Sequence, residues 1–224
     1  MTAVLTALAL TSGFVQTNKP ILIAVRSKVG AAYKYALSTD MNAVGASGKM
    51  GFKATISEKL VSRQGDNWKW RQTFDVTSTY ANGVFSGSDA NFKDMDGLKF
   101  DLTTDSTGQT KSMEVNGIKV GSNGTPNVTF SRKAVRVGDK WGAVVETNGM
   151  QIKIEYSLRA VRAEKGTRLA VIHGNYLPKQ PVVNNGPIVF SVDLADGKLL
   201  KAAGAFTVTR GGATVQGKYS LSRL

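Results

Sequence analysis

Residues 68–76, WKWRQTFDV, decide the fold class of this chain. Apolar residues stand at positions 68, 70, 74 and 76, while the residues at 69, 71, 73 and 75 are charged or hydroxylic. In an extended chain, alternate side chains point to opposite faces, so the large apolar groups share one face. A helix would repeat every 3.6 residues instead. The stretch therefore predicts a β-strand that has one buried face and one exposed face.

The same period of two recurs along the chain, and turn signals separate the segments that carry it. Tyr33, Tyr35 and Leu37 begin the series. Pairs such as Asn148-Gly149 favour tight hairpins, because glycine adopts positive φ angles without steric cost. We therefore predict an all-β protein, in which an antiparallel meander forms a curved sheet, half-barrel or open barrel.

The chain length of 224 residues fits a single β-rich domain, predicted to span residues 17–224. Two stretches, at about 30–125 and 127–224, show the same order of strand, glycine turn, long strand, glycine turn and strand. The tetrad Gly-Asp-x-Trp occurs at 65–68 and at 138–141, but at different places in that order. The sequence thus predicts two loosely similar halves without a strict repeat.

Charge is the strongest signal in the composition. The formal net charge is +13. Residues 1–131 hold 14 Lys and Arg against 10 Asp and Glu, and residues 132–224 hold 15 against 6. A basic surface attracts polyanions such as nucleic acid, anionic lipid headgroups or acidic envelope polymers. The alternative is a soluble surface that uses lysine without a specific partner.

The N-terminal residues 1–16, MTAVLTALALTSGFVQ, carry no charge and are mostly small or apolar. The segment is shorter than a membrane-spanning helix requires. It is similar to the apolar part of a secretory signal, which predicts an exported, periplasmic or extracellular protein. The other interpretation is an N-terminal apolar segment that packs on the domain.

Several chemistries are disfavoured, and we predict no cofactor, metal or catalytic residue. The chain has no cysteine, which removes thiolate metal sites and cysteine nucleophiles. Residues 43–50, AVGASGKM, lack the first glycine and the final Ser or Thr of a phosphate-binding loop. The aspartates between 89 and 105 do not have the spacing of a calcium loop. His173 is the single histidine, so a hydrolase that uses it remains an unfavoured alternative.

Two groups of residues are candidates for binding. The first group contains aromatic side chains and the histidine, which either line a ligand site or fill the core: Trp68, Trp70, Phe74, Trp141, Tyr156 and His173. The second group contains basic residues that could contact polyanions: Lys69, Arg71, Arg159, Arg162 and Arg168. Tryptophans interleaved with cations also leave open a protein that binds single-stranded nucleic acid, through base stacking and backbone charge.

The second half of the chain contains a corner, AVRVGDKW at residues 134–141, whose Gly138-Asp139 pair predicts a structural turn. The segments VTFSRKAVRVGDKWG, IEYSLRAVRAEKGTRLAVIHG and GPIVFSVDLADGKLLKAAGAFTV resemble a family of uncharacterised secreted or lipoprotein-like bacterial β-proteins. That family has a "V-x-vGdsW" corner at the start of the second half of its domain. The positions that match here are Val135, Gly138, Asp139, Trp141, Tyr156, Leu158, Gly166, Gly174, Asp193, Gly197 and Lys198.

In the first half, the resemblance extends only to the motif Tyr33-x-Tyr35-x-Leu37, and this chain lacks the lipobox cysteine. The resemblance implies a β-rich cell-envelope protein, and it supplies no catalytic residues. We therefore expect a non-enzymatic, exported binding or scaffold module. Its concave sheet could hold an apolar ligand or lipid, and its basic exterior would meet anionic envelope polymers.

Overall fold

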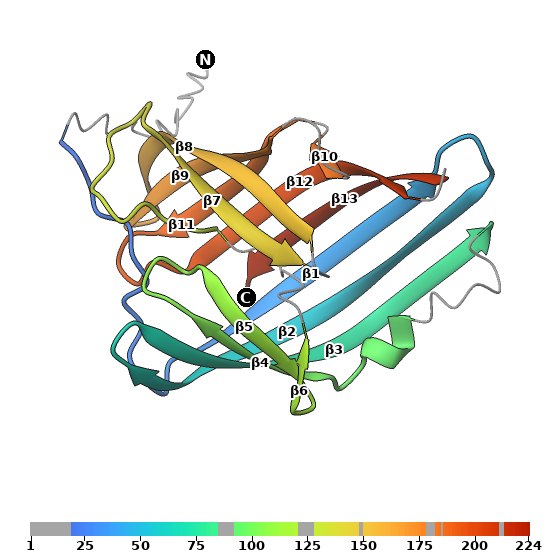
Figure 1. Ribbon diagram of the computed structural model, residues 1–224, viewed down its shortest axis with the longest axis horizontal. Helices are drawn as coiled ribbons and strands as arrows, with labels where there is room; N and C mark the ends of the chain where they lie inside the picture. The colour runs from blue at the N-terminus through green and yellow to red at the C-terminus, as the bar shows by residue number, and fades with distance from the viewer. Residues whose placement is uncertain are drawn as a thin grey trace, which may run out of the picture.

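A computed structural model of the chain describes residues 19–84, 92–120, 128–147, 150–177, 182–184, 186–210 and 213–224. These residues form one antiparallel sheet of thirteen strands together with one short 3-10 helix (Figure 1). The predicted all-β class and the open, curved meander are confirmed. The predicted signal segment, 1–16, lies outside the described residues.

The strands divide into two consecutive groups. The first group contains β1 (Ala32–Ala43), β2 (Gly48–Gln64), β3 (Asn67–Gly83), β4 (Lys99–Thr104), β5 (Thr110–Val115) and β6 (Ile118–Val120). The helix η1 (Phe92–Met95) lies between β3 and β4. The second group is β7 (Lys140–Thr147), β8 (Met150–Glu164), β9 (Thr167–Tyr176), β10 (Val182–Asn184), β11 (Ile188–Asp193), β12 (Leu199–Arg210) and β13 (Ala213–Arg223).

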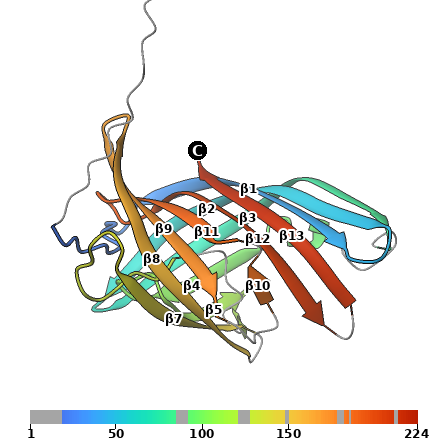
Figure 2. The ribbon, with the colours of Figure 1, turned by 90° about the horizontal axis from the view of Figure 1, so that it is seen from above.

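The two groups meet through the first and last strands of the chain. The order in the sheet is β6-β5-β4-β3-β2-β1-β13-β12-β11-β9-β8-β7, and β10 pairs with β12 outside this path. The sheet curls so that the strands at its two ends turn toward each other around a common interior (Figures 1 and 2). Because β6 and β7 are the two ends of the order and do not pair, the barrel stays open.

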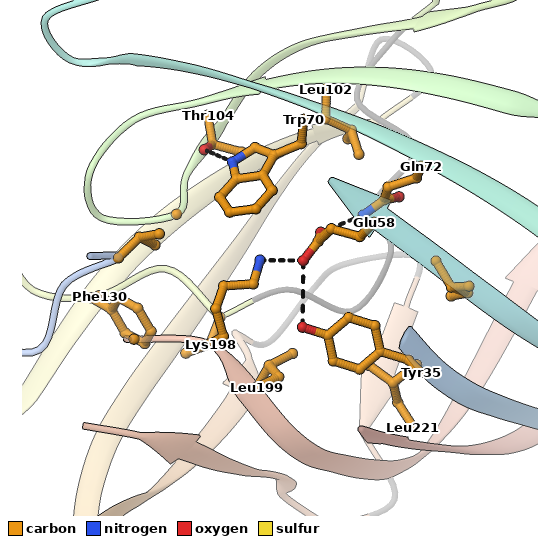
Figure 3. A pocket seen from close by; sticks show the side chains of 15 residues that line it. Tyr35, Glu58, Trp70, Gln72, Leu102, Thr104, Phe130, Lys198, Leu199 and Leu221 are labelled. Atoms are coloured by element: carbon orange, nitrogen blue, oxygen red, sulfur yellow. Dashed lines mark hydrogen bonds and ion pairs between the residues drawn. The ribbon is translucent and has the colours of Figure 1, made fainter. Parts of the chain in front are cut away.

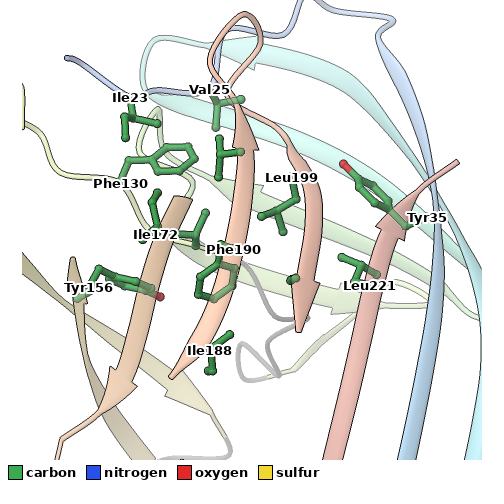
Figure 4. Packing of buried hydrophobic residues seen from close by; sticks show 14 of the residues in the cluster. Ile23, Val25, Tyr35, Phe130, Tyr156, Ile172, Ile188, Phe190, Leu199 and Leu221 are labelled. Atoms are coloured by element: carbon green, nitrogen blue, oxygen red, sulfur yellow. The ribbon is translucent and has the colours of Figure 1, made fainter. Parts of the chain in front are cut away.

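The concave side of the sheet holds the core, as the alternation in residues 68–76 predicted. Trp68, Trp70 and Phe74 on β3 are almost fully buried, at 1%, 2% and 5% exposure. One end of the interior is closed by Ile23 and Val25, which precede β1, and by segment 128–130, which precedes β7; both segments pack into the core (Figure 4). The burial of these large apolar side chains supplies most of the driving force for folding.

Both groups of strands begin with the same hydrogen-bonded junction. The amide of Gly30 donates to the carbonyl of Leu60, and the amide of Leu60 donates back to the residue after the glycine. Gly138 and Leu158 make the same two hydrogen bonds in the second group. Each glycine has a positive φ, 92° and 99°, and each leucine adjoins a bulge. The corner at Gly138 is thus a structural turn, and its counterpart is Gly30.

The turns that follow β4 and β11 also correspond. Asp105 and Asp193 each accept a hydrogen bond from the amide two residues later, and each pairs with an arginine. The arginine is Arg132 in the first case and Arg223 in the second, with N–O distances of 2.9 and 3.0 Å. The two groups are therefore related in detail, although their sequences are only loosely similar.

Beyond the packed interior, the same concave face continues along β1, β2, β12 and β13. By register, six apolar side chains there point to the side that buries Leu37 and Leu221. All six are half-buried, and we call them the distal face: Met41, Met50, Phe206, Val208, Val215 and Tyr219. The ring of Phe206 lies across Gly217, where a Cβ would collide with it. The ring of Tyr219 lies against Gly204, where a Cβ would be 3.3 Å from the ring.

Candidate functional site

A small internal cavity lies between the two groups of strands, next to the closed end of the interior. Its volume is about 50 Å³. Apolar side chains and glycines supply most of its wall: Val25, Ile56, Trp70, Leu102, Gly108, Val128, Phe130, Gly197, Leu199 and Leu221. The polar residues Tyr35, Glu58, Gln72, Thr104 and Lys198 complete it (Figure 3). The cavity has room for about three water molecules or for one small group of a larger ligand.

The main polar feature of the cavity is a buried ion pair. Lys198, in the turn before β12, places its Nζ 2.5 Å from Oε1 of Glu58 on β2. The two side chains are only 10% and 6% exposed. Gln72 on β3 donates from Nε2 to Oε2 of Glu58 at 2.9 Å, and Tyr35 donates its hydroxyl to Oε1 at 3.4 Å. The carboxylate therefore has three donors, as a buried charge requires.

Aromatic groups hold the cation from the other side. Lys198 Nζ lies 3.9 Å from the ring centroid of Trp70, which is a favourable cation–π distance. The indole nitrogen of Trp70 in turn donates to Oγ1 of Thr104 at 3.2 Å. Burial, and secondly the charge of Glu58, raise the pKa of Tyr35. The phenol of Tyr35 therefore stays protonated and remains a hydrogen-bond donor.

One buried acceptor in this cluster has no partner among the described residues. It is Oε1 of Gln72, a side chain that is 7% exposed. The amide cannot turn over to satisfy this oxygen, because Nε2 would then leave Glu58 and the oxygen would face a carboxylate. The geometry therefore leaves one buried hydrogen-bond acceptor beside Glu58 unused.

The corresponding place in the second group of strands contains no polar cluster. Leu60 and Leu158 occupy equivalent places in the two groups of strands. Glu58 and Tyr156 each stand two residues before them and therefore correspond. Their cross-strand partners, Gln72 and Gly174, correspond as well. Tyr156 is fully buried, and its ring lies against Gly174, where a Cβ would be 3.1 Å from the ring. An aromatic ring thus fills the position that a carboxylate and an amide occupy in the first group. The two groups of strands thus fill this position differently, one with a polar cluster and the other with an aromatic ring.

The predicted aromatic candidates lie in the core, and one of them also lines the cavity. Trp68, Phe74 and Tyr156 are buried and do not contact the cavity, whereas Trp70 forms part of its wall. Trp141 is half-buried, stacks on Tyr156 with 5.8 Å between ring centroids, and donates to the carbonyl of Thr129. The buried rings of Trp68 and Trp70 offer no free face on which bases could stack.

The single histidine lies away from the cavity. His173 on β9 follows Ile172, which points into the core, and so belongs to the opposite face of the sheet. No described hydrogen bond or ion pair reaches its ring. Partial burial, and secondly the charge of Arg159, lower the pKa of His173. The described residues thus provide no catalytic relay around this histidine.

The predicted polyanion contacts separate into two sets. Lys69 and Arg71 both pair with Asp101, with N–O distances of 3.2 and 2.8 Å. Their charge is therefore partly neutralised, and the arginine lowers the pKa of Asp101 most. Three further arginines are exposed on the second group of strands: Arg159, Arg162 and Arg168. The structure does not bring the two sets together.

Glu58, Gln72 and Lys198 form the centre of the site, yet the sequence did not single them out as functional. A signal was present, because Glu58 alternates with Ile56 and Leu60 on the apolar face of β2. Gln72 likewise stands between Trp70 and Phe74 on the apolar face of β3. Polar residues at inward positions of two strands mark either a buried network or a binding site.

Comparisons with known proteins give remote structural neighbours. No family model and no curated protein matches the chain. A solved DUF1329 family protein from Desulfovibrio piger matches 86% of this chain and 85% of its own, with 12% identity and a TM-score of 0.30. A domain from Vibrio parahaemolyticus, described as an outer membrane lipoprotein-sorting protein, matches the same shares with 13% identity and a TM-score of 0.29.

The described residues contain no helix that is both long and apolar enough to cross a membrane. Within the same residues, no group of three or more His, Asp or Glu side chains is arranged to hold a metal ion. The polar cluster around Glu58 therefore stands as the candidate site.

Proposed function

We propose that this protein is a non-enzymatic binding module of the cell envelope, which holds an apolar ligand along its concave face. The observation that carries this proposal is the continuity of that face. Along β1 it passes from Tyr35 and Leu37 at the packed interior to Met41 on the distal face. Along β13 it passes from Leu221 to Val215. A ligand laid on this surface would remove half-buried apolar side chains from water, at about 25 cal/mol for each Å² buried.

The dimensions assign different parts of the ligand to different parts of the face. The cavity of about 50 Å³ accepts one end group and no longer chain. The body of the ligand would lie outside it, over the distal face. There the rings of Phe206 and Tyr219 lie against glycines of the neighbouring strands.

A binding function fits the chemistry of the cavity better than catalysis does. Glu58 and Lys198 neutralise each other, and Glu58 is further held by Gln72. Each charged group is thus fixed by a partner instead of being poised for proton transfer. The exposed arginines of the second group of strands, Arg159 among them, would face anionic envelope polymers.

The test is native mass spectrometry, combined with lipid extraction, of protein purified from its own host. We expect an apolar ligand bound at about one per chain. Met41→Asp places a charge on the distal face and should lower the bound fraction. Asn42→Asp, on the opposite and exposed face of the same strand, should leave it unchanged. If the wild-type protein carries no ligand and takes up none from extracted host lipids, the proposal is wrong.

A further inference from the structure

The convex side of the central strands carries a set of exposed lysines. The strands β12, β13, β1 and β2 are consecutive in the middle of the sheet, and their concave side faces the interior. The side chains that alternate with the inward ones point to the convex side. Six of them are exposed lysines, and we call them the lysine ladder: Lys34, Lys49, Lys53, Lys59, Lys201 and Lys218. On this side of the four described strands, Asp40 is the one acidic residue.

The strand register gives the ladder a regular order, because each successive row of side chains across these four strands contains one lysine. The rows that cross β1 at positions 32, 34, 36, 38, 40 and 42 contain, in that order, Lys59, Lys34, Lys201, Lys53, Lys218 and Lys49. Two residues of a strand advance by about 6.8 Å, so the six rows extend over about 34 Å. No lysine of the ladder is more than two strands away from β1.

The ladder differs from the neighbouring strands in the pairing of its charges. No ion pair or side-chain hydrogen bond among the described residues involves a ladder amine. On β3 and β4, by contrast, Lys69 and Arg71 share Asp101, and on the outer strands β7 and β8 Lys140 pairs with Glu155. Opposite charges across strands stabilise a sheet, whereas unbalanced like charges repel one another. The stability of the fold therefore does not account for the ladder.

The surface between the lysines is built from small side chains. The register places alanine, serine and threonine there: Ala36, Ser38, Thr55, Ser57, Ala203, Ser220 and Ser222. Such residues let a bound chain approach the sheet closely, and their hydroxyls can donate to anionic oxygens. The convex side of these four described strands presents no aromatic ring on which a base could stack.

We infer that the lysine ladder binds a linear polyanion, which lies along β1 and is held through the charges of its backbone. The ladder is on the face opposite to the apolar concave face, so neither this inference nor its test depends on the proposed apolar ligand. The surface is also distinct from exposed arginines such as Arg159, which lie on other strands.

The spacing of the ladder favours an extended single chain. Successive phosphates in one strand of a duplex are only about 3.4 Å apart along the axis, which is half the step of the ladder. A backbone that is not held by stacked bases can extend and separate its charges further. A flat membrane surface would have to meet the sheet across the strands as well as along them, and the sheet curls in the crosswise direction (Figure 2).

The test compares two fluorescently labelled oligomers of equal length. One is oligothymidylate, and the other is an abasic deoxyribose phosphate oligomer, which has the same backbone charges and no bases. Binding to the delipidated full-length protein is measured by fluorescence anisotropy, and we expect equal affinities for the two oligomers. With six contacts of about 0.7 each, the slope of log K against log salt should be about −4, so the affinity should fall about 300-fold between about 50 and 200 mM salt.

Four substitutions remove ladder charges and leave two contacts: Lys34→Gln, Lys53→Gln, Lys201→Gln and Lys218→Gln. The slope should then be about −1.4, and the affinity should fall only about sevenfold over the same range of salt. A matched control has the same net charge but loses four exposed lysines outside the ladder: Lys19→Gln, Lys28→Gln, Lys99→Gln and Lys133→Gln. The control should keep a slope of about −4.

Urea unfolding checks that both variants are folded. If the fourfold ladder variant is not, Lys53→Gln combined with Lys201→Gln replaces it and should give a slope of about −2.8.

The possible results have separate meanings. Equal slopes in the ladder variant and the control would show that binding follows net charge alone, and would overturn the inference. A preference of more than about tenfold for oligothymidylate would assign the surface to nucleic-acid bases, and binding to phosphatidylglycerol vesicles without binding to either oligomer would assign it to a membrane. Both results would also overturn the inference. Native mass spectrometry tests the apolar ligand separately, so the proposed function can fail while the polyanion surface stands.

Discussion

The buried pair of Glu58 and Lys198 allows a quantitative prediction about stability. At 2.5 Å and an effective dielectric constant of about 20, the direct attraction is about 7 kcal/mol. The desolvation of two groups that are only 6% and 10% exposed offsets most of it. The pair as a whole should therefore contribute little, although the loss of one partner should cost much.

Three variants separate these effects. Glu58→Met leaves the ammonium of Lys198 buried without a counter-ion, and we expect a loss of about 3–5 kcal/mol in the free energy of unfolding. Lys198→Met leaves a carboxylate that still accepts from Gln72 and Tyr35, so the loss should be smaller, about 2–3 kcal/mol. The double variant removes both charges and should lose only about 1–3 kcal/mol, mainly because Gln72 loses its acceptor.

The assay is urea unfolding followed by tryptophan fluorescence, with all four proteins measured under the same conditions. The double variant should be more stable than the sum of the single losses predicts, by a coupling of about 4–5 kcal/mol. The exposed pair Lys140–Glu155, with an Nζ–Oε1 distance of 2.9 Å, serves as the surface control. Its coupling should stay below about 1 kcal/mol. Additive losses at Glu58 and Lys198 would refute the reasoning.

Two further predictions concern the core and its response to alkali. Trp141→Ala should lower the free energy of unfolding by about 3 kcal/mol, and Trp141→Phe, which loses the indole hydrogen bond but keeps a ring, by about 1 kcal/mol; urea unfolding measures both. Burial raises the pKa of Tyr156 to about 12, against 10.0 for a free phenol. The unfolded chain then releases this proton first, so the contribution of Tyr156 to stability is constant below pH 10. It falls between pH 10 and 12, by about 1.4 kcal/mol per pH unit. Thermal melts across that range should show the slope, and Tyr156→Phe should reduce it; an unchanged slope would contradict the assignment.

The local pattern of the sequence was enough to predict how single strands lie. Trp70 and Phe74 are inward because extended residues alternate, and Gly138 forms a turn because its φ of 99° suits glycine. The same alternation placed Gln72 inward as well. The pattern does not predict whether such a polar residue finds a hydrogen-bond partner. In this case the partner of Gln72 is Glu58, which lies on another strand.

The sequence by itself determined the all-β class, the concave and convex faces of the strands, and the turns at glycines, since these depend on neighbours within a few residues. The tertiary structure alone decided that Lys198 meets Glu58, 140 positions away in the chain, because that contact exists only after β1 pairs with β13 and the sheet curls. It also decided that the two groups of strands differ at one place, a carboxylate against an aromatic ring. Long-range pairing brings such residues together, and no local period can encode it.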